Sequence, residues 1–573
     1  MKQISEYKKS VDLLAVAGLG LCTLSLHAQK KEAKKPNIIV ILTDDMGYSD
    51  IGCYGSEINT PNIDKLGMNG IRFTQFYNTA RSSCSRASLL TGLYPHEANM
   101  GFLSNYNYTE PGYGDDLSKN SVTLAEVLKN SGYSTYMSGK WHLSKNIEDA
   151  TGDKSNWPMQ RGFERFFGIL NGSDNYYDPG TLMSNNTFIA PAKNFYLTYA
   201  ISDTAVSYIR NQSKEKPFFM YVAFTAAHWP LQAPENEIDK YKGKYNIGWD
   251  SVREMRFEKQ KKLGIIPKNT VLSTRSPEIP AWKEETMKPF QERRMETYAA
   301  MIDAMDQGVG KIIAALKQKG ELENTIIFYM HDNGGCAELE GSDKPTVPLT
   351  DEQKVLKPLP ADYIQMSKKP EYTRDGKIVR SGRGVMAGPA DTWMAYGPEW
   401  ANVSNTPFRL YKQYVHQGGI ASPLIINWPQ GIKNKGAITR QVSHLMDIMP
   451  TIIELSGANY PATINGNKIQ PLEGISLTPT FVNKTVDRKL VFWEHQANRA
   501  LRVGNWKLVA KTKSPKKFTK ADENSWELYN LEQDPSEMIN LALKYPEKVK
   551  EMSEIWKKEA LRTKALPWPW DRN

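Results

Sequence analysis

The sequence predicts an α/β protein: a large, doubly wound and mostly parallel sheet flanked by helices, followed by a smaller C-terminal α+β domain on an antiparallel sheet. Three observations favour this fold. Several short runs are continuously apolar and rich in β-branched residues, which is typical of strands buried on both faces. Helical patterns separate these runs, as in a parallel sheet with crossover helices. After Gly457 the pattern changes to short aromatic strands.

The elements of the large domain follow in order along the chain. The stretch "SVTLAEVLKNSGY" predicts a capped amphipathic helix that ends at Gly132. A long amphipathic helix is expected over 295–320, because its apolar residues recur on one side. The expected strands are 37–42 ("NIIVIL"), 134–140 ("STYMSGK"), 217–224 ("PFFMYVAF"), 325–332 ("TIIFYMHD") and 423–429 ("PLIINWP").

Two polar stretches punctuated by Pro and Gly, 232–295 and 337–405, interrupt the pattern and are expected to line a site. In the C-terminal part, "LVFWEH", "RALRVGNWKLVA" and "WELYNL" predict antiparallel strands, and a helix is expected over 546–560. We therefore divide the chain into a large α/β domain at 29–455 and an α+β subdomain at 456–573.

The N-terminus has the pattern of a signal peptide spanning residues 1–28. Lys8 and Lys9 precede an apolar run over 11–26, and Leu26-His27-Ala28 ends the run like a signal-peptidase site. The run is too short for a stable membrane span. Leu21 is large where lipoprotein cleavage before Cys22 requires a small residue, so we expect export to the periplasm or beyond without a lipid anchor.

Composition excludes several other classes of protein. Apolar residues make up 40% of the 573 residues, which is too many for a disordered chain. The net charge of +10 suits an acidic ligand, but no zinc-finger spacing, RNP-like motif or basic helix indicates nucleic-acid binding. Cleavage of the expected signal peptide removes Cys22. The three cysteines that remain, Cys53, Cys84 and Cys336, are an odd number without a pairing pattern, so a disulfide scaffold is not expected.

Polar residues end two of the buried strands. Asp44 and Asp45 follow the first strand, and Asp332 and Asn333 end the strand in "HDNGG". Open α/β sheets bind ligands at the carboxyl ends of their strands, and adjacent carboxylates repel unless a cation lies between them. Oxygen ligands without a nearby Cys/His pair favour Ca²⁺ or Mg²⁺ over zinc.

These motifs together resemble the sulfatase family, in the alkaline-phosphatase superfamily. The resemblance covers most of the mature chain, and each stretch alone is short but the set is highly specific. It implies a sulfuric ester hydrolase. The stretches, in the family's order, are "NIIVILTDDMGYSDIGCYG", "SSCSRASLLTGLYPH", "SGKWHL", "HDNGG", "YKQYVHQGGIASPLIINWP" and "ELYNLEQDPSEMINLA".

The family signature identifies the nucleophile. It reads Cys or Ser, any residue, usually Pro or Ala, any residue, then Arg. With Arg86 at the signature arginine, Ser82 takes the nucleophile position and Cys84 is a departure at the middle position. Cys84 itself has Ser88 four residues on and fails the pattern. The resemblance therefore implies that a serine-type maturation enzyme oxidises Ser82 to formylglycine.

The chemistry explains why an aldehyde is required at this position. Its hydrate carries two hydroxyls on one carbon: one attacks sulfur, and the other, once deprotonated, expels sulfate by breaking the C–O bond. An ordinary serine would be trapped as a stable sulfate ester. We expect one Ca²⁺ to lower the hydroxyl pKa and to hold the sulfate. Its expected ligands are Asp44, Asp45, Asp332, Asn333 and the residue 82 side chain.

The resemblance assigns the remaining charged residues of the active site. Arg86 holds the formylglycine, and Lys140 in "SGKWHL" contacts sulfate and the diol. His142 in the same motif is the base that releases sulfate. His228 in "AAHWP" resembles the histidine that serves the leaving group. Lys412 in "RLYKQYVHQGG" matches the lysine that neutralises sulfate and can protonate the leaving oxygen.

Substrate contacts are expected from two further stretches. His495 and Arg499, in "WEHQANRALR", suit sugar hydroxyls or a second acidic group, with ordinary strand positions as an equal alternative. Tyr176 and Tyr177, in the turn-rich "NGSDNYYDPG", are expected to be exposed and to stack on a sugar, with a structural turn as the alternative. His416 is interpreted as structural.

The sequence thus predicts an exported, calcium-dependent sulfatase that hydrolyses sulfate esters on carbohydrates, in the manner of glycan-degrading sulfatases of gut anaerobes. One alternative is a phosphate or phosphonate ester hydrolase, because the superfamily shares this metal platform. The other is a non-catalytic sulfoglycan-binding protein, if Ser82 is not oxidised. A binder would not need His142 and His228 together, which argues against that alternative.

Overall fold

The computed structural model describes residues 34–145, 147–149, 151–341, 345–346, 348–350, 356–512 and 525–572. The expected signal peptide, including Cys22, lies outside the described residues. Lys35–Asn573 form one compact unit. No helix among the described residues combines the length and the apolar character that a membrane crossing requires.

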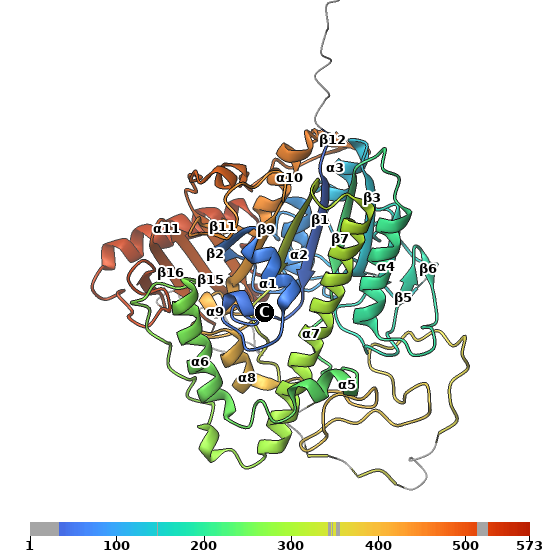
Figure 1. The fold of residues 1–573 in the computed structure, drawn as a ribbon. Coiled ribbons are helices and arrows are strands. Elements are labelled where there is room, and N and C mark those ends of the chain that lie inside the picture. Colours follow the sequence, from blue (N-terminus) through green and yellow to red (C-terminus); the bar gives the residue numbers. More distant parts are fainter. Residues whose placement is uncertain are drawn as a thin grey trace, which may run out of the picture. The chain divides into compact units, whose positions relative to one another are not determined.

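An 11-stranded sheet forms the centre of this unit (Figure 1). The strand order is β10-β2-β9-β8-β1-β7-β3-β4-β5-β6, and β11 pairs with β2. The strands are β1 (Asn37–Thr43), β2 (Ile71–Tyr77), β3 (Ser134–Lys140), β4 (Arg165–Ile169), β5 (Leu182–Ser184), β6 (Thr187–Phe188), β7 (Phe218–Ala223), β8 (Thr325–His331), β9 (Ala421–Asn427), β10 (Ala437–Thr439) and β11 (Ser443–His444).

The middle of the sheet is parallel: β8, β1, β7, β3 and β4 run in one direction. β9 is antiparallel to both β8 and β2. The predicted fold, a mostly parallel sheet with helices and a C-terminal antiparallel sheet, is therefore confirmed. All five expected strands are present, and β2 and β4 are strands that the sequence patterns did not indicate.

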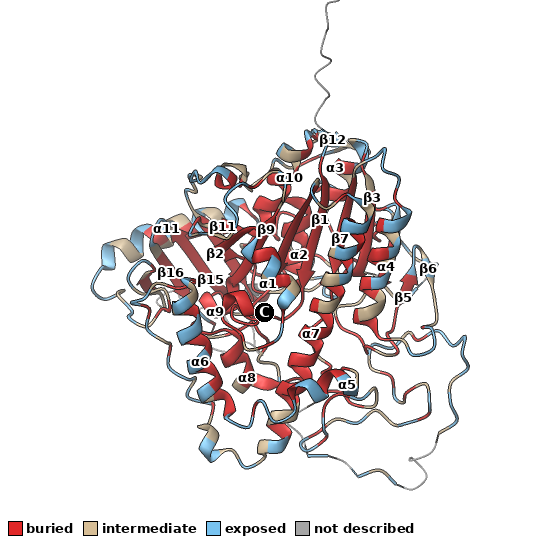
Figure 2. Cartoon of the chain, viewed as in Figure 1, coloured by how far each residue is buried: buried red, intermediate tan, exposed pale blue. Residues whose placement is uncertain are grey.

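β1 shows why the central strands are uniformly apolar. Each of its residues is buried, and it pairs with β7 and β8 on its two sides. Ile39 and Ile41 pack into the core on one face of the sheet, whereas Val40 and Leu42 pack into the core on the other. Because both faces are covered, a run such as "NIIVIL" needs no alternation with polar residues. Figure 2 shows the central strands buried along their length.

Helices cover both faces of the sheet. α1 and α4 each contact α7 on one face, and α2, α3 and α10 pack together on the other (Figure 1). The predicted cap of α3 is present and is a capping box, with Thr123 and Glu126 each accepting from the other's backbone N–H. The α-helices are α1 (Pro61–Met68), α2 (Ser82–Thr91), α3 (Leu124–Asn130), α4 (Leu197–Asn211), α5 (Glu235–Ile238), α6 (Gly248–Leu263), α7 (Lys288–Lys319), α8 (Gly397–Ser404), α9 (Gln417–Ile420), α10 (Ile448–Ser456) and α11 (Pro546–Arg562).

The two insertions differ in structure. The first, 232–295, contains α6, which packs against α8, and the start of α7. The second, 337–405, has α8 as the α-helix among its described residues. Both insertions contribute to a cavity beside the site described below, as expected.

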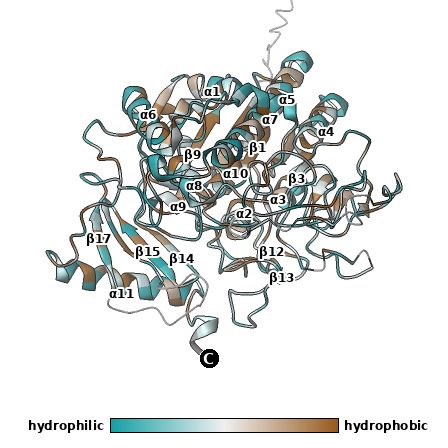
Figure 3. Cartoon of the chain, turned by 90° about the horizontal axis from the view of Figure 1, so that it is seen from below, coloured by the Kyte–Doolittle hydropathy of each residue, from teal (hydrophilic) through white to brown (hydrophobic). Residues whose placement is uncertain are grey.

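The C-terminal part is a four-stranded antiparallel sheet with α11 packed against it (Figure 3). Trp493 ties this sheet to the large domain, because its Nε1 donates to Asn78 O at 2.8 Å. Leu477 and Phe481, from the segment before the sheet, pack into the core of the large sheet. The division of the chain at 455/456 stays a prediction. The strands are β14 (Val491–His495), β15 (Asn498–Val503), β16 (Trp506–Ala510) and β17 (Glu527–Asn530), with a short hairpin of β12 (Thr463–Ile464) and β13 (Asn467–Lys468) before them.

Candidate active site

Adjacent strands of the sheet end at one place. In the order β8, β1, β7 and β3, their carboxyl ends lead to Asp332, Asp44, His228 and Lys140. Parallel strands bring their carboxyl ends to one edge of the sheet, so residues far apart in sequence meet there. Five of the predicted residues are linked directly to one another by hydrogen bonds or ion pairs around this edge, namely Asp44, Asp45, Asp332, Lys140 and Arg86. Asn333, Lys412 and His228 join them through Asp45.

Ser82 is the first residue of α2 and lies over this edge. The Arg86 side chain, one turn further on, donates from Nε to Ser82 Oγ at 3.0 Å. The other guanidinium nitrogens of Arg86 reach Lys140 O at 3.0 Å, Asp44 Oδ2 at 3.3 Å and Asp332 Oδ2 at 3.5 Å. Arg86 is fully buried, so this arginine fixes the position of the residue 82 oxygen relative to the carboxylates.

Carboxylate and amide oxygens gather beneath Ser82. Asp45 N donates to Asp332 Oδ1 at 3.2 Å, and Asn333 Nδ2 donates to Asp45 Oδ1 at 2.7 Å. Asp44 Oδ1 and Asn333 Oδ1 are buried with no hydrogen-bond partner among the described residues. Burial and the charge of Asp332 raise the pKa of Asp44 despite the nearby Lys140. The cluster therefore holds more buried oxygen than its protein partners satisfy.

These residues fit a hard cation. Ligand atoms of Asp44, Asp45 and His228 all lie within 4.8 Å of one another. The partnerless oxygens of Asp44 and Asn333 are the ligand type that Ca²⁺ and Mg²⁺ prefer. A bound cation would satisfy those oxygens and reduce the repulsion between the carboxylates.

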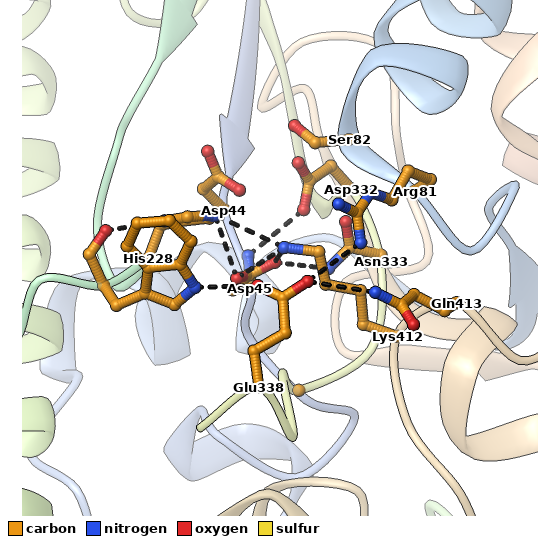
Figure 4. Close-up of polar contacts among 12 residues, drawn as sticks. Asp44, Asp45, Arg81, Ser82, His228, Asp332, Asn333, Glu338, Lys412 and Gln413 are labelled. Carbon is orange, nitrogen blue, oxygen red and sulfur yellow. Dashed lines mark hydrogen bonds and ion pairs between the residues drawn. The ribbon is translucent and has the colours of Figure 1, made fainter. Parts of the chain in front are cut away.

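Lys412 and His228 form a second group on the other side of Asp45 (Figure 4). Lys412 Nζ lies 2.8 Å from Asp45 Oδ2 and 3.3 Å from His228 Nε2. His228 Nδ1 donates to Trp229 O at 2.7 Å, which leaves the Nε2 lone pair facing Lys412. Burial lowers the pKa of His228 to about 4 although Asp45 opposes this, whereas Asp45 raises the pKa of Lys412 against the effect of burial. The pair therefore consists of a neutral imidazole and a charged ammonium.

Lys140 and His142 come from the end of β3. Lys140 Nζ makes a short ion pair with Asp44 Oδ2, and both side chains are buried. Burial and the charges of Lys140 and Arg86 hold the pKa of His142 well below its usual value. The Nδ1 atom of His142 has no hydrogen-bond partner in the described structure. His142 is thus a neutral base beside two cations.

The backbone is strained at two of these residues. Asp45 and His142 both have a φ of 57°, in the left-handed region that costs a non-glycine residue about 1 kcal/mol or more. Gly172 packs against the His142 ring, and a Cβ there would lie 2.6 Å from His142 Nε2. The loop of 171–180 can therefore approach His142 only because position 172 is glycine.

A pocket of about 130 Å³ opens above these residues. It is large enough for a sulfate-sized group, and its wall carries more cationic than anionic side chains. Its lining includes five of the predicted catalytic residues, which are Ser82, Lys140, His142, His228 and Lys412.

The pocket lining also includes charged and aromatic side chains that the sequence patterns did not single out: Arg81, Trp229, Glu338 and Lys368. Glu338 accepts from Arg81 Nη1 at 3.0 Å and from Trp229 Nε1 at 2.9 Å. Arg81 and Trp229 could have been found, because each directly adjoins a predicted residue in sequence. Glu338 and Lys368 lie in the irregular second insertion, where no periodicity marks them.

The tyrosines of the 171–180 loop differ from the expectation of exposure. Tyr176 is 1% exposed, and its hydroxyl lies 2.7 Å from Thr225 O and 2.9 Å from His228 O. The expectation that Tyr176 is exposed is wrong, because it packs under the His228 loop and supports it. Tyr177 is half-buried and packs against Tyr196. This geometry matches the alternative of a structural turn.

His495 and Arg499 lie outside the lining of the pocket. His495 is fully buried, stacks on Phe102, and has its Nδ1 3.9 Å from Cys84 Sγ. The Arg499 guanidinium lies over the ring of Trp526 at 4.3 Å, within the C-terminal sheet and α11. Both residues occupy core positions, as the strand alternative describes.

Cys84 and His416 are buried groups. Burial raises the pKa of the Cys84 thiol to about 12, so the thiol is not ionised at neutral pH. This agrees with the prediction that Cys84 is not the nucleophile. His416 Nε2 lies 3.3 Å from Glu527 Oε2, a contact between the large domain and the C-terminal sheet.

A small basic pocket next to an oxygen-rich cluster, at the carboxyl edge of a doubly wound sheet, defines an enzyme that binds an anionic ester. Comparison with known families gives the particular class. Residues 36–458 match the sulfatase family, and residues 408–564 match the family described as "N-sulphoglucosamine sulphohydrolase, C-terminal". The chain belongs to the sulfatase family and is a sulfuric ester hydrolase.

Individual relatives agree with this assignment. The chain is 36% identical to an uncharacterized sulfatase of Schizosaccharomyces pombe, over 92% of this chain and 94% of the relative. It is 34% identical to an arylsulfatase of Klebsiella aerogenes, over 79% and 93%. It is 25% identical to an N-acetylglucosamine-6-O-sulfatase of Bacteroides thetaiotaomicron, over 96% and 91%.

A solved structure shares the fold. It is a protein in complex with its substrate D-glucosamine-2-N,6-O-disulfate, with a TM-score of 0.59 and 23% identity, over 94% of this chain and 99% of that chain.

Proposed function

We propose that the chain is an exported sulfatase that removes O-sulfate groups from carbohydrates, with Ser82 oxidised to formylglycine and one bound Ca²⁺. The observation that supports this best is the geometry around Ser82. Its oxygen accepts from a buried Arg86, and the pocket above it contains Lys140, Lys412 and two neutral histidines. A binding protein would need the cations but not the histidines.

In this proposal the two lysines bind the sulfate. Negative charge moves toward the leaving oxygen in the transition state, and fixed buried cations stabilise that charge. Lys412 is also 3.3 Å from His228 Nε2, so a proton can pass within this pair toward the leaving alcohol. His142 is neutral and can accept the proton whose loss releases sulfate.

Arg86 and the metal site prepare the nucleophile. Arg86 orients the residue 82 oxygen and brings no negative charge toward the incoming sulfate. Asp44, Asp45, Asp332 and Asn333 would hold the Ca²⁺, which when bound supplies activation of the nucleophilic hydroxyl and charge for the sulfate oxygens.

Three further parts of the proposal rest on sequence and relatives. The carbohydrate substrate is supported by the N-acetylglucosamine-6-O-sulfatase relative, whose name states a sugar substrate. The serine at position 82 implies a serine-type maturation enzyme as partner. The pattern of residues 1–28 supports export to the periplasm.

The test compares protein produced with and without a serine-type maturation enzyme. Conversion is read by peptide mass spectrometry as the loss of two hydrogen atoms at residue 82. We expect the converted protein to hydrolyse 4-nitrophenyl sulfate and N-acetylglucosamine 6-sulfate, and the unconverted protein to show little turnover. Faster hydrolysis of the matching phosphate esters would favour the phosphatase alternative.

Matched variants and an export assay complete the test. Ser82→Ala should be inactive, whereas Ser83→Ala, which changes the neighbouring buried serine, should keep its activity. Activity in Ser82→Ala would refute the nucleophile. Export predicts that the native host yields protein whose N-terminus begins after Ala28, as read by N-terminal sequencing.

A further inference from the structure

A second and larger cavity, of about 630 Å³, adjoins the catalytic pocket. The two spaces share Glu338 and Lys412 in their linings, so these side chains form the partition between them. Most of the remaining wall comes from the two insertions and from residues 410–414. When a sulfate occupies the catalytic pocket, this larger cavity is open to the rest of the substrate. We call it the leaving-group cavity.

The two spaces differ in charge. The catalytic pocket has Arg81, Lys140, Lys368 and Lys412 in its wall, against Glu338. The described lining of the leaving-group cavity has three carboxylates, Glu278, Glu338 and Glu340, and two lysines, Lys369 and Lys412. Lys412 is bound to Asp45 at 2.8 Å, so its charge is directed at the catalytic side. The described lining of the leaving-group cavity therefore offers more carboxylate acceptors than cations.

Glu338 is held in a fixed position at the partition. Its Oε1 accepts from Arg81 Nη1 and from Gln413 Nε2, both at 3.0 Å, and its Oε2 accepts from Trp229 Nε1 at 2.9 Å (Figure 4). Burial raises the pKa of this carboxyl, but the charges of Lys412 and Arg81 outweigh burial and hold it well below its usual value. About 27% of the side chain is exposed. A carboxylate so fixed keeps unused lone pairs for a donor on the substrate.

Glu278 and Glu340 extend the same charge along the cavity. Both residues are exposed, and Glu340 Oε1 accepts from Trp393 Nε1 at 3.0 Å, which orients it. A second sulfate or a carboxylate on the substrate would face three carboxylates in the described lining, against Lys369 as the lysine there that is not bound to Asp45. A hydroxyl or an ammonium group would find acceptors instead.

We propose that the leaving-group cavity selects sulfate esters whose leaving group is neutral or cationic and rejects those that carry a second anionic group near the cleaved ester. This inference rests on the proposed function, because it concerns the substrate of the same site. It narrows the substrate to hydroxyl- or amine-bearing monosulfates, and it disfavours polysulfated or uronate-rich chains.

The test uses three aryl sulfates: 4-ethylphenyl, 4-(aminomethyl)phenyl and 4-(carboxymethyl)phenyl sulfate. They differ in the charge of the para substituent, and a methylene group separates that charge from the ring. The converted full-length protein is assayed for kcat/KM at low salt, with 4-nitrophenyl sulfate as the reference. We expect the carboxymethyl substrate to be slower than the other two by roughly fivefold, the effect of one charge pair about 8 Å apart at an effective dielectric constant of about 40. The difference should shrink in 0.5 M salt.

A double variant, Glu278→Gln with Glu340→Gln, should reduce the difference between the substrates. Glu547→Gln with Glu554→Gln, which changes two exposed glutamates on α11, is the control for net charge and should leave the difference unchanged. Equal rates on the three substrates, or a double variant that behaves like the control, would overturn the inference. Absence of turnover on every aryl sulfate, 4-nitrophenyl sulfate included, would instead count against the proposed function.

Discussion

Removal of one hydroxyl group should loosen the loop that carries His228. The Tyr176 hydroxyl lies within hydrogen-bond distance of Thr225 O and His228 O. A hydroxyl has one proton, so these two carbonyls share it. Tyr176→Phe removes the donor and keeps the ring, which stacks on Tyr196 with 5.8 Å between centroids. The perturbation is therefore limited to the hydrogen bond.

The expected loss of stability depends on whether each of the two carbonyl oxygens keeps a hydrogen-bond donor in Tyr176→Phe. Thr225 O keeps a partner, because His228 N also donates to it at 3.0 Å. For His228 O, no other donor is found among the described residues. The loss is about 1 kcal/mol for the net hydrogen bond plus about 1 to 2 kcal/mol for one unpaired buried carbonyl. We expect a free energy of unfolding that is lower by about 2 to 3 kcal/mol.

Activity should change in a substrate-dependent way. In the role proposed for His228, a displaced ring would serve the leaving group less well, which matters most where the leaving alcohol is a poor one. We expect kcat on a sugar sulfate to fall about tenfold and kcat on 4-nitrophenyl sulfate to change by about threefold or less.

The assay combines urea unfolding with kinetics on both substrates. Tyr177→Phe is the matched control, since it lies on the same loop and no hydrogen bond of its hydroxyl is found within the described structure. If Tyr176→Phe equalled this control in stability and in the ratio of the two rates, the positioning role would be refuted.

Three other changes test separate parts of the structure. Asp332→Ala should lose bound calcium, measured by elemental analysis after dialysis, together with activity; full activity in the presence of a chelator would contradict the metal site. Cys84→Ala should still be converted and active, because the Cys84 thiol is buried and its pKa is raised to about 12; loss of conversion by peptide mass spectrometry would show that the maturation enzyme reads this side chain. Burial and Glu473 raise the pKa of Glu97 to about 8, so its stabilising contribution is complete below about pH 4.5 and is lost as the pH rises to about 8. Each tenfold change in the ionisation constant is worth about 1.4 kcal/mol, so the stability lost as Glu97 ionises has an upper bound of roughly 5 kcal/mol. Glu97→Gln should therefore raise Tm by a few degrees at pH 8 and by less at pH 5. An equal change in Tm at both pH values would exclude the linkage.

Prediction from the sequence worked where one physical rule decides the outcome. A strand such as β1, buried on both faces, is a continuous apolar run, and the carboxyl ends of β1 and β8 must meet because the strands are parallel neighbours. Asp44 and Asp332 could therefore be placed together without coordinates. The roles of Lys412 and His228 came from the family resemblance.

Prediction failed where tertiary contacts override the local pattern. β2, "IRFTQFY", mixes polar and aromatic residues, and its pairing with β9 shifts register between Phe73 and Phe76, so no regular pattern marks it as a strand. Tyr176 was expected to be exposed, but it is buried because the loop that follows β7 and carries His228 packs over it. Glu338 belongs to a segment without periodicity, and its contacts with Arg81 and Gln413 span 257 and 75 residues of sequence. Such contacts leave no signal in a single sequence.

The burial of Ser82 sets an order of events. Ser82 is 2% exposed at the bottom of a pocket of about 130 Å³, so a sulfate group can reach it but the active site of another protein cannot. The proposed oxidation therefore has to take place before α2 packs into its final position beneath the catalytic pocket. The proposed oxidation of Ser82 then competes kinetically with folding. A molecule that folds before it is oxidised stays unconverted until it unfolds. The active fraction of a preparation would thus record the ratio of two rates, and slower folding during synthesis would raise it.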